Sequence, residues 1–264
     1  MTLRSAYYSI RHAGVKRVRR LYRVIDKASF WKKKLWYCPC CNTRLYRWKE
    51  GKFGKQPKLY NPERYKSITY PTICPVCNSL QRHRIIVEYL KSGKINLQRS
   101  RILYFAVEEC VGDWLKSNKI GYDSADLYQC ADLQIDIEDT GLEDKSYDLI
   151  VCNHVLEHVN DYKRALGELH RILTDQGLLI CSFPMDLSLD TVYEDETITS
   201  RDDRIKHFGQ YDHLRIFGKD SRKIIEDVGF RVSTVDEELL LSEAILLKAG
   251  PAEYDLPIVF VCRK

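Results

Sequence analysis

The stretch that decides the fold spans residues 146–184 and reads S-Y-D-L-I-V-C-N-H-V-L-E-H-V-N-D-Y-K-R-A-L-G-E-L-H-R-I-L-T-D-Q-G-L-L-I-C-S-F-P. Its apolar runs at 147–152 and 178–183 are short enough to be strands covered on both faces. Between them, apolar residues recur at helical spacing, and Asn160 or Asp161 can cap the helix start. Gly177 is expected to take a left-handed turn after the helix. A strand, a crossover helix and a strand predict a right-handed parallel α/β unit.

The polar residues that follow 147–152 are Asn153, His154, Glu157 and His158. In open parallel sheets, ligands bind beyond the carboxyl ends of the strands, so these side chains should face a ligand. The segments D-L-I-V-C-N-H-V-L-E-H-V and R-I-L-T-D-Q-G-L-L-I resemble the fourth strand, fourth helix and fifth strand of class I S-adenosylmethionine-dependent methyltransferases. This resemblance implies a Rossmann-like sheet of seven strands and S-adenosylmethionine as the cofactor, with Asn153 and His158 among the cofactor-binding residues.

Residues 101–108, R-I-L-Y-F-A-V-E, look like the first strand of that fold, but the turn that follows contains no glycine. Ala106 stands where a glycine would let the backbone approach the methionine part of the cofactor. The next helix can still offer its N-terminal amides to a carboxylate. We expect Glu108, at the strand end, to contact the ammonium group of the cofactor.

Two further acids follow the next predicted strands. Asp126 lies 18 residues after Glu108, close to the spacing at which an acid binds the ribose hydroxyls in nucleotide-binding sheets, and Asp123 is its rival. Residues 133–137 read as the third strand. By resemblance, Asp136 would bond the adenine amino group and the Ile137 backbone would meet the ring.

The overall composition fits one α/β domain with a small appendage in a chain of 264 residues. No run of eighteen apolar residues occurs and the first residues lack a signal-peptide core, so we expect a cytoplasmic protein. In a reducing compartment, ten cysteines are better explained as metal ligands and packing residues than as disulfides.

Residues 1–35 contain eleven Arg or Lys and a single acid, Asp26. Apolar residues recur among them, which predicts a basic amphipathic helical arm. The arm could dock on the catalytic domain with its basic face in water. Two alternatives are contact with an anionic membrane surface, which would place the protein on the inner face of the membrane, and contact with RNA phosphates.

The pattern C-P-x-C-N occurs twice, starting at Cys38 and at Cys74. Each turn presents two thiolates to one ion, so Cys38, Cys41, Cys74 and Cys77 predict a tetrahedral zinc site. Four thiolates leave no open position, which indicates a structural zinc in a module spanning residues 36–78. Cys40 has no counterpart in the second turn and is expected to take no part.

A helix is predicted from Ser79, as its cap, to about residue 90, with Arg82, His83 and Arg84 in its first turns. Positive charge at a helix N-terminus opposes the helix dipole. A carboxylate of the main domain or an anionic ligand should therefore lie nearby.

The sequence H-V-L-E-H at residues 154–158 matches the inverted zinc-protease signature H-x-x-E-H. A protease would need this motif in a long helix, whereas here it follows a strand, so the protease reading is set aside. Ubiquinone-biosynthesis O-methyltransferases have a Glu-x-x-Glu-His metal site at the equivalent place. A divalent cation at His154, Glu157 and His158 is therefore an open alternative.

Residues 185–215 form a polar insertion after the fifth strand, which usually indicates a substrate lid. His213 is the first candidate for a general base, with Asp212 or Glu194 orienting it, and His154 is the second. We expect the acceptor to be bound by Tyr193, Gln210 and Arg215.

Residues 36–235 resemble a subgroup of these methyltransferases that is often found near genes for surface polysaccharides. It shares C-P-x-C, S-L-x-R-H-R, N-H-V-L-E-H and F-G-Q-x-D-H-x-R. Residues 79–264 would then form the methyltransferase domain, with 230–235 and 256–262 as an antiparallel pair at the sheet edge.

The resemblance predicts methyl transfer to a sugar hydroxyl of a surface glycan or a glycolipid precursor. RNA or protein methylation is the alternative, with the zinc module and the basic arm holding a polymer. The non-enzymatic alternative is a binding module that has the same fold but no longer binds the methyl donor.

Overall fold

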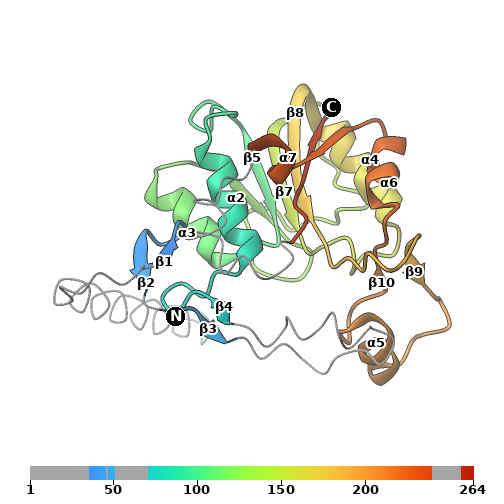
Figure 1. The fold of residues 1–264 in the computed structure, drawn as a ribbon. Helices are drawn as coiled ribbons and strands as arrows, with labels where there is room; N and C mark the ends of the chain where they lie inside the picture. Colours follow the sequence, from blue (N-terminus) through green and yellow to red (C-terminus); the bar gives the residue numbers. More distant parts are fainter. Residues whose placement is uncertain (1–35, 46, 51–70, 240–256) are drawn as a thin grey trace.

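The computed structural model describes residues 36–45, 47–50, 71–239 and 257–264. The predicted basic arm at 1–35 lies outside the described residues. The described core is a six-stranded sheet in the order β11-β12-β8-β7-β5-β6 (Figure 1). Its strands are β5 (Ile102–Phe105), β6 (Asp123–Ala125), β7 (Tyr147–Asn153), β8 (Leu173–Ser182), β11 (Arg231–Thr234) and β12 (Phe260–Arg263).

Strands β6, β5, β7 and β8 are parallel, while β12 and β11 are antiparallel at the opposite edge. The predicted parallel unit and the predicted antiparallel pair are therefore confirmed. The predicted third strand at 133–137 is wrong as a full strand, because the described residues form only one bridge there, between Ala125 and Leu133. Gln134 and Asp136 are exposed, and the chain turns at once through a bridge from Asp136 to Asp139.

Helices cover both faces of the sheet (Figure 1). The helices α2 (Gln81–Lys91), α3 (Glu109–Ser117) and α7 (Val235–Leu239) share one hydrophobic core with the N-terminal module. The helices α4 (Tyr162–Ile172) and α6 (Ser221–Asp227) share the other core. Two separate cores explain why strands such as β7 are buried on both faces and read as continuous apolar runs.

The start of α4 agrees with its sequence signal, whereas its end does not. The Asp161 side chain accepts hydrogen bonds from the amides of Lys163 and Arg164, which confirms the predicted cap. The expected left-handed turn at Gly177 is wrong, because α4 ends at Ile172 and β8 continues through Gly177. A Cβ at Gly177 would lie 2.8 Å from Leu173 Cδ2, so glycine is required here for close packing.

The described part of the N-terminal module consists of two small antiparallel pairs. Strand β1 (Trp36–Cys38) pairs with β2 (Thr43–Leu45), and β3 (Lys49–Glu50) pairs with β4 (Pro71–Ile73). Asn42 and Asn78 follow the second cysteine of each C-P-x-C turn, and both have positive φ, 53° and 58°. Asparagine tolerates this left-handed conformation, which explains the fifth residue of the repeated pattern.

Ser79 is not the cap of α2, contrary to the prediction. Leu80 occupies the cap position, and the Ser79 hydroxyl lies 3.2 Å from Cys38 Sγ instead. The Ser79 carbonyl accepts a hydrogen bond from Arg84 Nη1 at 2.7 Å. The serine therefore links the cysteine cluster to α2.

The predicted insertion contains β9 (Tyr193–Glu194), α5 (Arg201–Phe208) and β10 (Arg215–Ile216), and β9 pairs with β10. Helix α5 begins after Ser200, whose hydroxyl accepts from the Asp203 amide, and it ends at Gly209 in the left-handed conformation. The insertion meets the segment after β7, since the Leu214 amide donates to the Glu157 carbonyl at 2.8 Å. It therefore lies at the carboxyl edge of the parallel strands.

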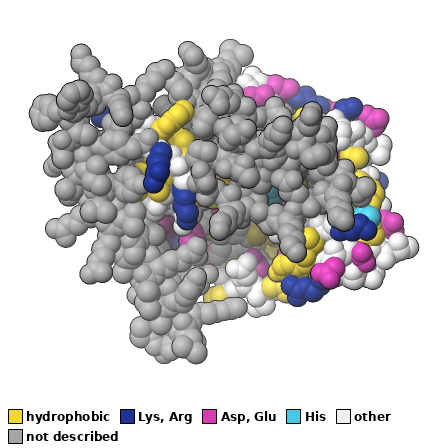
Figure 2. Space-filling model, turned by 60° about the horizontal axis from the view of Figure 1, so that its bottom comes forward, with side chains coloured by type: hydrophobic (Ala, Val, Ile, Leu, Met, Phe, Trp, Pro, Cys, Tyr) yellow, Lys and Arg dark blue, Asp and Glu magenta, His cyan; other side chains and the backbone are white. Residues whose placement is uncertain are grey.

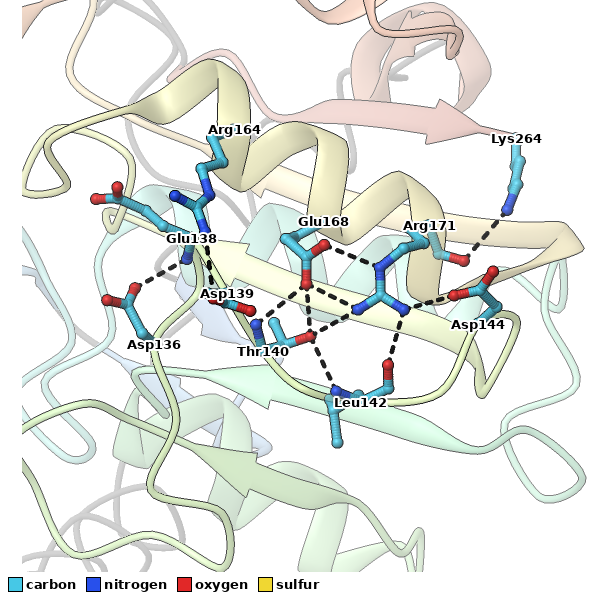
Figure 3. Close-up of polar contacts among 10 residues, drawn as sticks. All are labelled: Asp136, Glu138, Asp139, Thr140, Leu142, Asp144, Arg164, Glu168, Arg171 and Lys264. Carbon is cyan, nitrogen blue, oxygen red and sulfur yellow. Dashed lines mark hydrogen bonds and ion pairs between the residues drawn. The ribbon is translucent and has the colours of Figure 1, made fainter.

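The loop between the Asp136 turn and β7 is fastened to α4 by one charged network (Figure 3). Glu168 Oε2 accepts from both the amide and the hydroxyl of Thr140, at 3.1 and 2.9 Å. Arg171 bonds Glu168 and also donates to the Leu142 carbonyl at 2.8 Å. The network therefore fixes the segment that follows Asp136 and Ile137 in the chain.

Candidate active site

The first turn of the site holds an alanine in a backbone conformation that glycine adopts more readily. Ala106 has φ of 48°, in the left-handed region that normally favours glycine. Its amide donates to the Ala125 carbonyl at 2.9 Å. The chain therefore leaves β5 through a left-handed turn toward the amino end of α3, as the predicted donor site requires.

Glu108 is the carboxylate partner that the basic start of α2 predicted. Its Oε1 lies 2.7 Å from Arg82 Nη2 and 2.5 Å from His83 Nε2. Burial alone would raise the pKa of Glu108, but His83 and Arg82 outweigh it and lower the pKa to about 2. Its Oε2 lies 3.4 Å from Asn153 Nδ2, so this oxygen is the one directed toward the end of β7.

Asp126 and its rival Asp123 lie at opposite ends of β6. Asp126 follows β6 at its carboxyl end, and its Oδ1 accepts from the Tyr128 and Gln129 amides. Asp123 begins β6 at the other end and accepts from the Tyr147 hydroxyl at 2.9 Å. The rival assignment of Asp123 is therefore wrong.

Asp136 and Ile137 follow the single bridge that replaces the third strand. Asp136 is exposed and its Oδ1 accepts from the Glu138 amide at 2.8 Å, while Ile137 is buried. Their roles toward adenine stay a prediction.

The end of β7 carries Asn153, which is buried and accepts a hydrogen bond from the Ser182 hydroxyl at 3.0 Å. His154 follows with φ of 51°, which turns its side chain out of the strand. Its Nδ1 lies 3.0 Å from Glu157 Oε1. His154 therefore pairs with a carboxylate directly beyond the carboxyl end of a central strand.

Glu157 is fully buried, with 0% of its side chain exposed. The His154 contact has the distance of an ion pair but not the angles of a hydrogen bond, and neither Glu157 oxygen has a hydrogen-bond donor among the described residues. Burial alone would raise the pKa of Glu157, but His154 and His158 outweigh it and hold the pKa below its ordinary value. The site therefore contains a buried carboxylate anion faced by imidazoles.

His213 lies near Glu157, but neither Asp212 nor Glu194, its two expected partners, orients the ring. Its Nδ1 is 2.9 Å from the Phe208 carbonyl, which is the contact that orients the ring. Glu194 bonds Arg215 at 2.8 Å, and Asp212 contacts His158 instead. Burial lowers the pKa of His213 and leaves the side chain almost without exposed surface.

Arg215 is buried and already saturated by the chain, contrary to its predicted role in binding the acceptor. Besides Glu194, it donates to the carbonyls of Leu156, Val159 and Asn160, at 2.9, 2.5 and 2.9 Å. Its guanidinium also lies 4.8 Å from the Tyr162 ring centre. Arg215 therefore fastens the insertion to the segment after β7.

The other two acceptor candidates lie on the insertion. Gln210 is exposed, and the half-buried Tyr193 has its hydroxyl 2.7 Å from His207 Nδ1. Nothing in the structure tests whether they bind an acceptor. The exposed ring of Tyr211, with Arg201 stacked 4.1 Å from its centre, is an aromatic surface that the sequence analysis did not single out.

The four predicted cysteine ligands form one cluster. Two sulfur pairs, Cys38 with Cys77 and Cys41 with Cys74, are each 3.7 Å apart. Four thiolates around one zinc ion at about 2.3 Å lie roughly 3.8 Å from one another, so the donor set fits zinc. Cys40 is not part of the cluster, as expected.

The sequence analysis missed one neighbour of the site. Cys110, predicted to be a packing residue, lies 3.0 Å from His83 Nδ1. Contact with Cys40 and with His83 lowers the pKa of the Cys110 thiol to about 6, although burial opposes it. No sequence motif signals this contact, because His83 lies on α2 and Cys110 on α3.

A family model described as a methyltransferase domain matches residues 115–181. This span extends from α3 to β8 and includes the end of β7. No curated protein matches the chain.

Three of the similar solved structures are S-adenosylmethionine-dependent methyltransferases. One from Thermotoga maritima, a possible histamine N-methyltransferase, is 18% identical with a TM-score of 0.41, over 70% of this chain and 91% of that chain. One from Archaeoglobus fulgidus is 15% identical with a TM-score of 0.46, over 69% and 91%. One from Mesorhizobium loti is 13% identical with a TM-score of 0.46, over 70% and 100%.

Identities and TM-scores this low say nothing of the acceptor. The methyltransferase domain matched at 115–181 includes the strand end that carries Asn153, His154 and Glu157. Over residues 115–181, the chain is similar to a methyltransferase domain.

Proposed function

We propose that this chain is an S-adenosylmethionine-dependent methyltransferase that transfers the methyl group to a hydroxyl of a sugar, in a surface glycan or a glycolipid precursor. The observation that carries the proposal is the pair of His154 and the buried Glu157 at the carboxyl end of β7. A hydroxyl attacks the sulfonium methyl group effectively only if a base takes its proton. An imidazole held by a buried carboxylate supplies such a base.

His154 is a better candidate for this base than His213. About 29% of the His154 side chain is exposed, whereas His213 is 3% exposed. A general base must reach the proton that it abstracts. With Nδ1 of His154 facing Glu157, its Nε2 is left for the acceptor hydroxyl.

The donor would lie beside this pair. S-adenosylmethionine supplies an electrophilic methyl group, and the residues here fit it: Glu108 Oε2 for the ammonium group, Asp126 for the ribose hydroxyls, and Asp136 with Ile137 for adenine. The left-handed turn at Ala106 supports this assignment, because it is a conformation that glycine favours.

A sugar acceptor is supported by the groups on the insertion. Planar aromatic surfaces and amides suit sugar rings and hydroxyls, and Tyr193, Gln210 and Tyr211 all belong to the insertion. For RNA, a gathered basic surface would be expected. On the described part of the face in Figure 2, Lys and Arg side chains are interspersed with Asp and Glu side chains.

We further propose that the four cysteines hold a structural zinc ion. The buried cation of Arg84, next to Ser79 and the cluster, would offset part of the negative charge of four thiolates. Among the described helices, none has the length and apolar character needed to cross a bilayer. Contact of residues 1–35 with an anionic membrane belongs to the same proposal, and sedimentation with anionic vesicles tests it.

The test of the proposed function is transfer of a labelled methyl group to glycan, glycolipid and RNA fractions of the source cells. We expect label in a glycan or glycolipid. His154→Ala should lower turnover at least 100-fold, since general bases contribute about 10²–10⁴, and should leave binding of S-adenosylhomocysteine intact. His170→Gln, on α4, is the matched control. Label in RNA alone would contradict the sugar acceptor, and absence of donor binding would favour the binding module.

A further inference from the structure

Besides the four cysteines, a second group of side chains that could bind a metal lies where the insertion contacts the segment after β7. One ligand atom each from Glu157, His158 and His213 lie within 4.8 Å of one another. By sequence, Glu157 and His158 group with His154, whereas His213 is a separate candidate for the base. The fold brings His213 to this cluster from more than fifty residues away.

Each of the two imidazole rings directs its Nδ1 atom toward a backbone carbonyl. His213 Nδ1 faces the Phe208 carbonyl at 2.9 Å, and His158 Nδ1 faces the Asp212 carbonyl at 3.1 Å. A carbonyl only accepts hydrogen bonds, so each Nδ1 carries the proton and donates it. In a neutral ring, Nε2 is then a lone pair, as in histidines that bind a metal through Nε2 and donate from Nδ1 to a carbonyl.

These lone pairs face an anion. His158 Nε2 lies 4.0 Å from Glu157 Oε1, and His213 Nε2 is buried with no hydrogen-bond partner among the described residues. Both oxygens of the fully buried Glu157 also lack a hydrogen-bond donor there. A buried carboxylate opposite two nitrogen lone pairs is unfavourable unless a cation lies between them.

We propose that Glu157, His158 and His213 bind a divalent transition-metal ion. Two imidazoles and one carboxylate suit zinc, manganese or iron(II) better than magnesium, which prefers oxygen ligands. Atoms that share one such ion lie about 3 to 3.5 Å apart. His158, whose side chain is 33% exposed, has the freedom to move toward the two buried ligands.

The ion would fasten the insertion to the catalytic domain. His213 precedes β10, whereas Glu157 and His158 follow β7, so one ion cross-links two segments that flank His154. It would act together with Arg215, which joins the same segments by hydrogen bonds. This inference does not depend on methyl transfer or on the identity of the acceptor.

The experiment compares bound metal in four forms of the full chain: the wild type, Glu157→Gln, His213→Ala and the matched control His207→Ala. His207 lies on the same insertion and bonds the Tyr193 hydroxyl. Each protein is loaded with excess Zn²⁺, dialysed and analysed for zinc per chain. We expect the wild type and His207→Ala to hold one more ion than Glu157→Gln and His213→Ala.

Cobalt then separates this site from the four cysteines. Co²⁺ bound to thiolates gives a near-ultraviolet charge-transfer band, which all four proteins should show equally. After the visible bands of the thiolate-bound Co²⁺ are subtracted, the absorption of Co²⁺ bound to nitrogen and oxygen should be present in the wild type and lost in Glu157→Gln. Thermal melting should show an added metal-dependent stabilisation, beyond that of the cysteine-bound zinc, only in the proteins that bind this second ion.

Equal zinc content in the wild type and Glu157→Gln would overturn the proposal. Glu157→Gln keeps the size of the side chain, so it decides the question even if His213→Ala does not fold. A protein that binds the ion but transfers no methyl group would contradict the proposed function and leave this inference standing.

Discussion

The ion pairs of Glu108 predict a measurable loss of stability on Glu108→Gln. The substitution keeps the shape of the side chain but removes the anion between Arg82 and His83, whose side chains are only 20% and 8% exposed. Lowering the Glu108 pKa from 4.5 to about 2 is worth about 3 kcal/mol, at about 1.4 kcal/mol per pH unit. We expect the free energy of unfolding at pH 7 to fall by about 2 to 3 kcal/mol.

The dependence on pH follows from the direction of this shift. A carboxyl group with a lowered folded-state pKa contributes stability above its unfolded pKa, and this contribution is lost as pH falls toward the folded value. For Glu108 the loss therefore begins near pH 4.5 and is complete only near pH 2. Between pH 5 and 3.5, where unfolded-state histidines are already protonated, the difference between wild type and Glu108→Gln should shrink by about 1 kcal/mol.

Urea unfolding of both proteins at these pH values measures the effect, and Glu143→Gln on an exposed loop is the control. The control should lie within about 0.5 kcal/mol of the wild type at each pH. A Glu108→Gln difference below about 0.5 kcal/mol at pH 7, or one that stays constant down to pH 3.5, would refute the reasoning. The first result would mean that desolvation of Glu108 cancels its ion pairs.

Three further predictions concern the supports of the site. Cys74→Ser should lose the zinc of the cysteine cluster, measured by elemental analysis, and should lower the melting temperature by roughly 10 °C; unchanged zinc content would contradict the four-cysteine site. Arg215→Ala leaves three carbonyls without their donor and should cost about 3 to 5 kcal/mol in urea unfolding, with Arg215→Lys recovering only part of it; a cost near zero would mean that the insertion is held elsewhere. Gly177→Ala places a Cβ 2.8 Å from Leu173 Cδ2 and 2.9 Å from the Thr174 carbonyl and should cost about 1 to 3 kcal/mol, whereas a stabilised variant would show that β8 is free to shift.

Local signals predicted the parts of the fold that short segments control. The apolar runs of β7 and β8, the Asp161 cap and the two C-P-x-C turns depend on neighbours within a few residues, and the structure agrees with them. The location of polar side chains at a strand end was also predictable, because the polar residues after β7 interrupt a buried apolar run. The third strand was not, since whether 133–137 pairs along its length depends on Asp132, which bonds Ser124, and on the turn at Asp136.

Roles of individual polar side chains were harder to predict, because their partners come from elsewhere in the chain. Arg215 has the residue type of an acceptor ligand, yet its donors are taken by carbonyls more than fifty residues earlier. The sequence predicted His213 as an accessible base, whereas in the structure its side chain is buried beside Glu157. Whether such a side chain binds a ligand or another part of the protein is decided only by long-range packing.

The sequence by itself determined the parallel α/β unit, the clustered cysteine pairs and the strand ends that carry polar residues, because periodicity and spacing are local properties. The tertiary structure alone decided which imidazole reaches solvent and which faces the buried Glu157 carboxylate. It also decided that Glu108 neutralises the start of α2. Burial and charge pairing join residues far apart in the chain, so no local pattern encodes them.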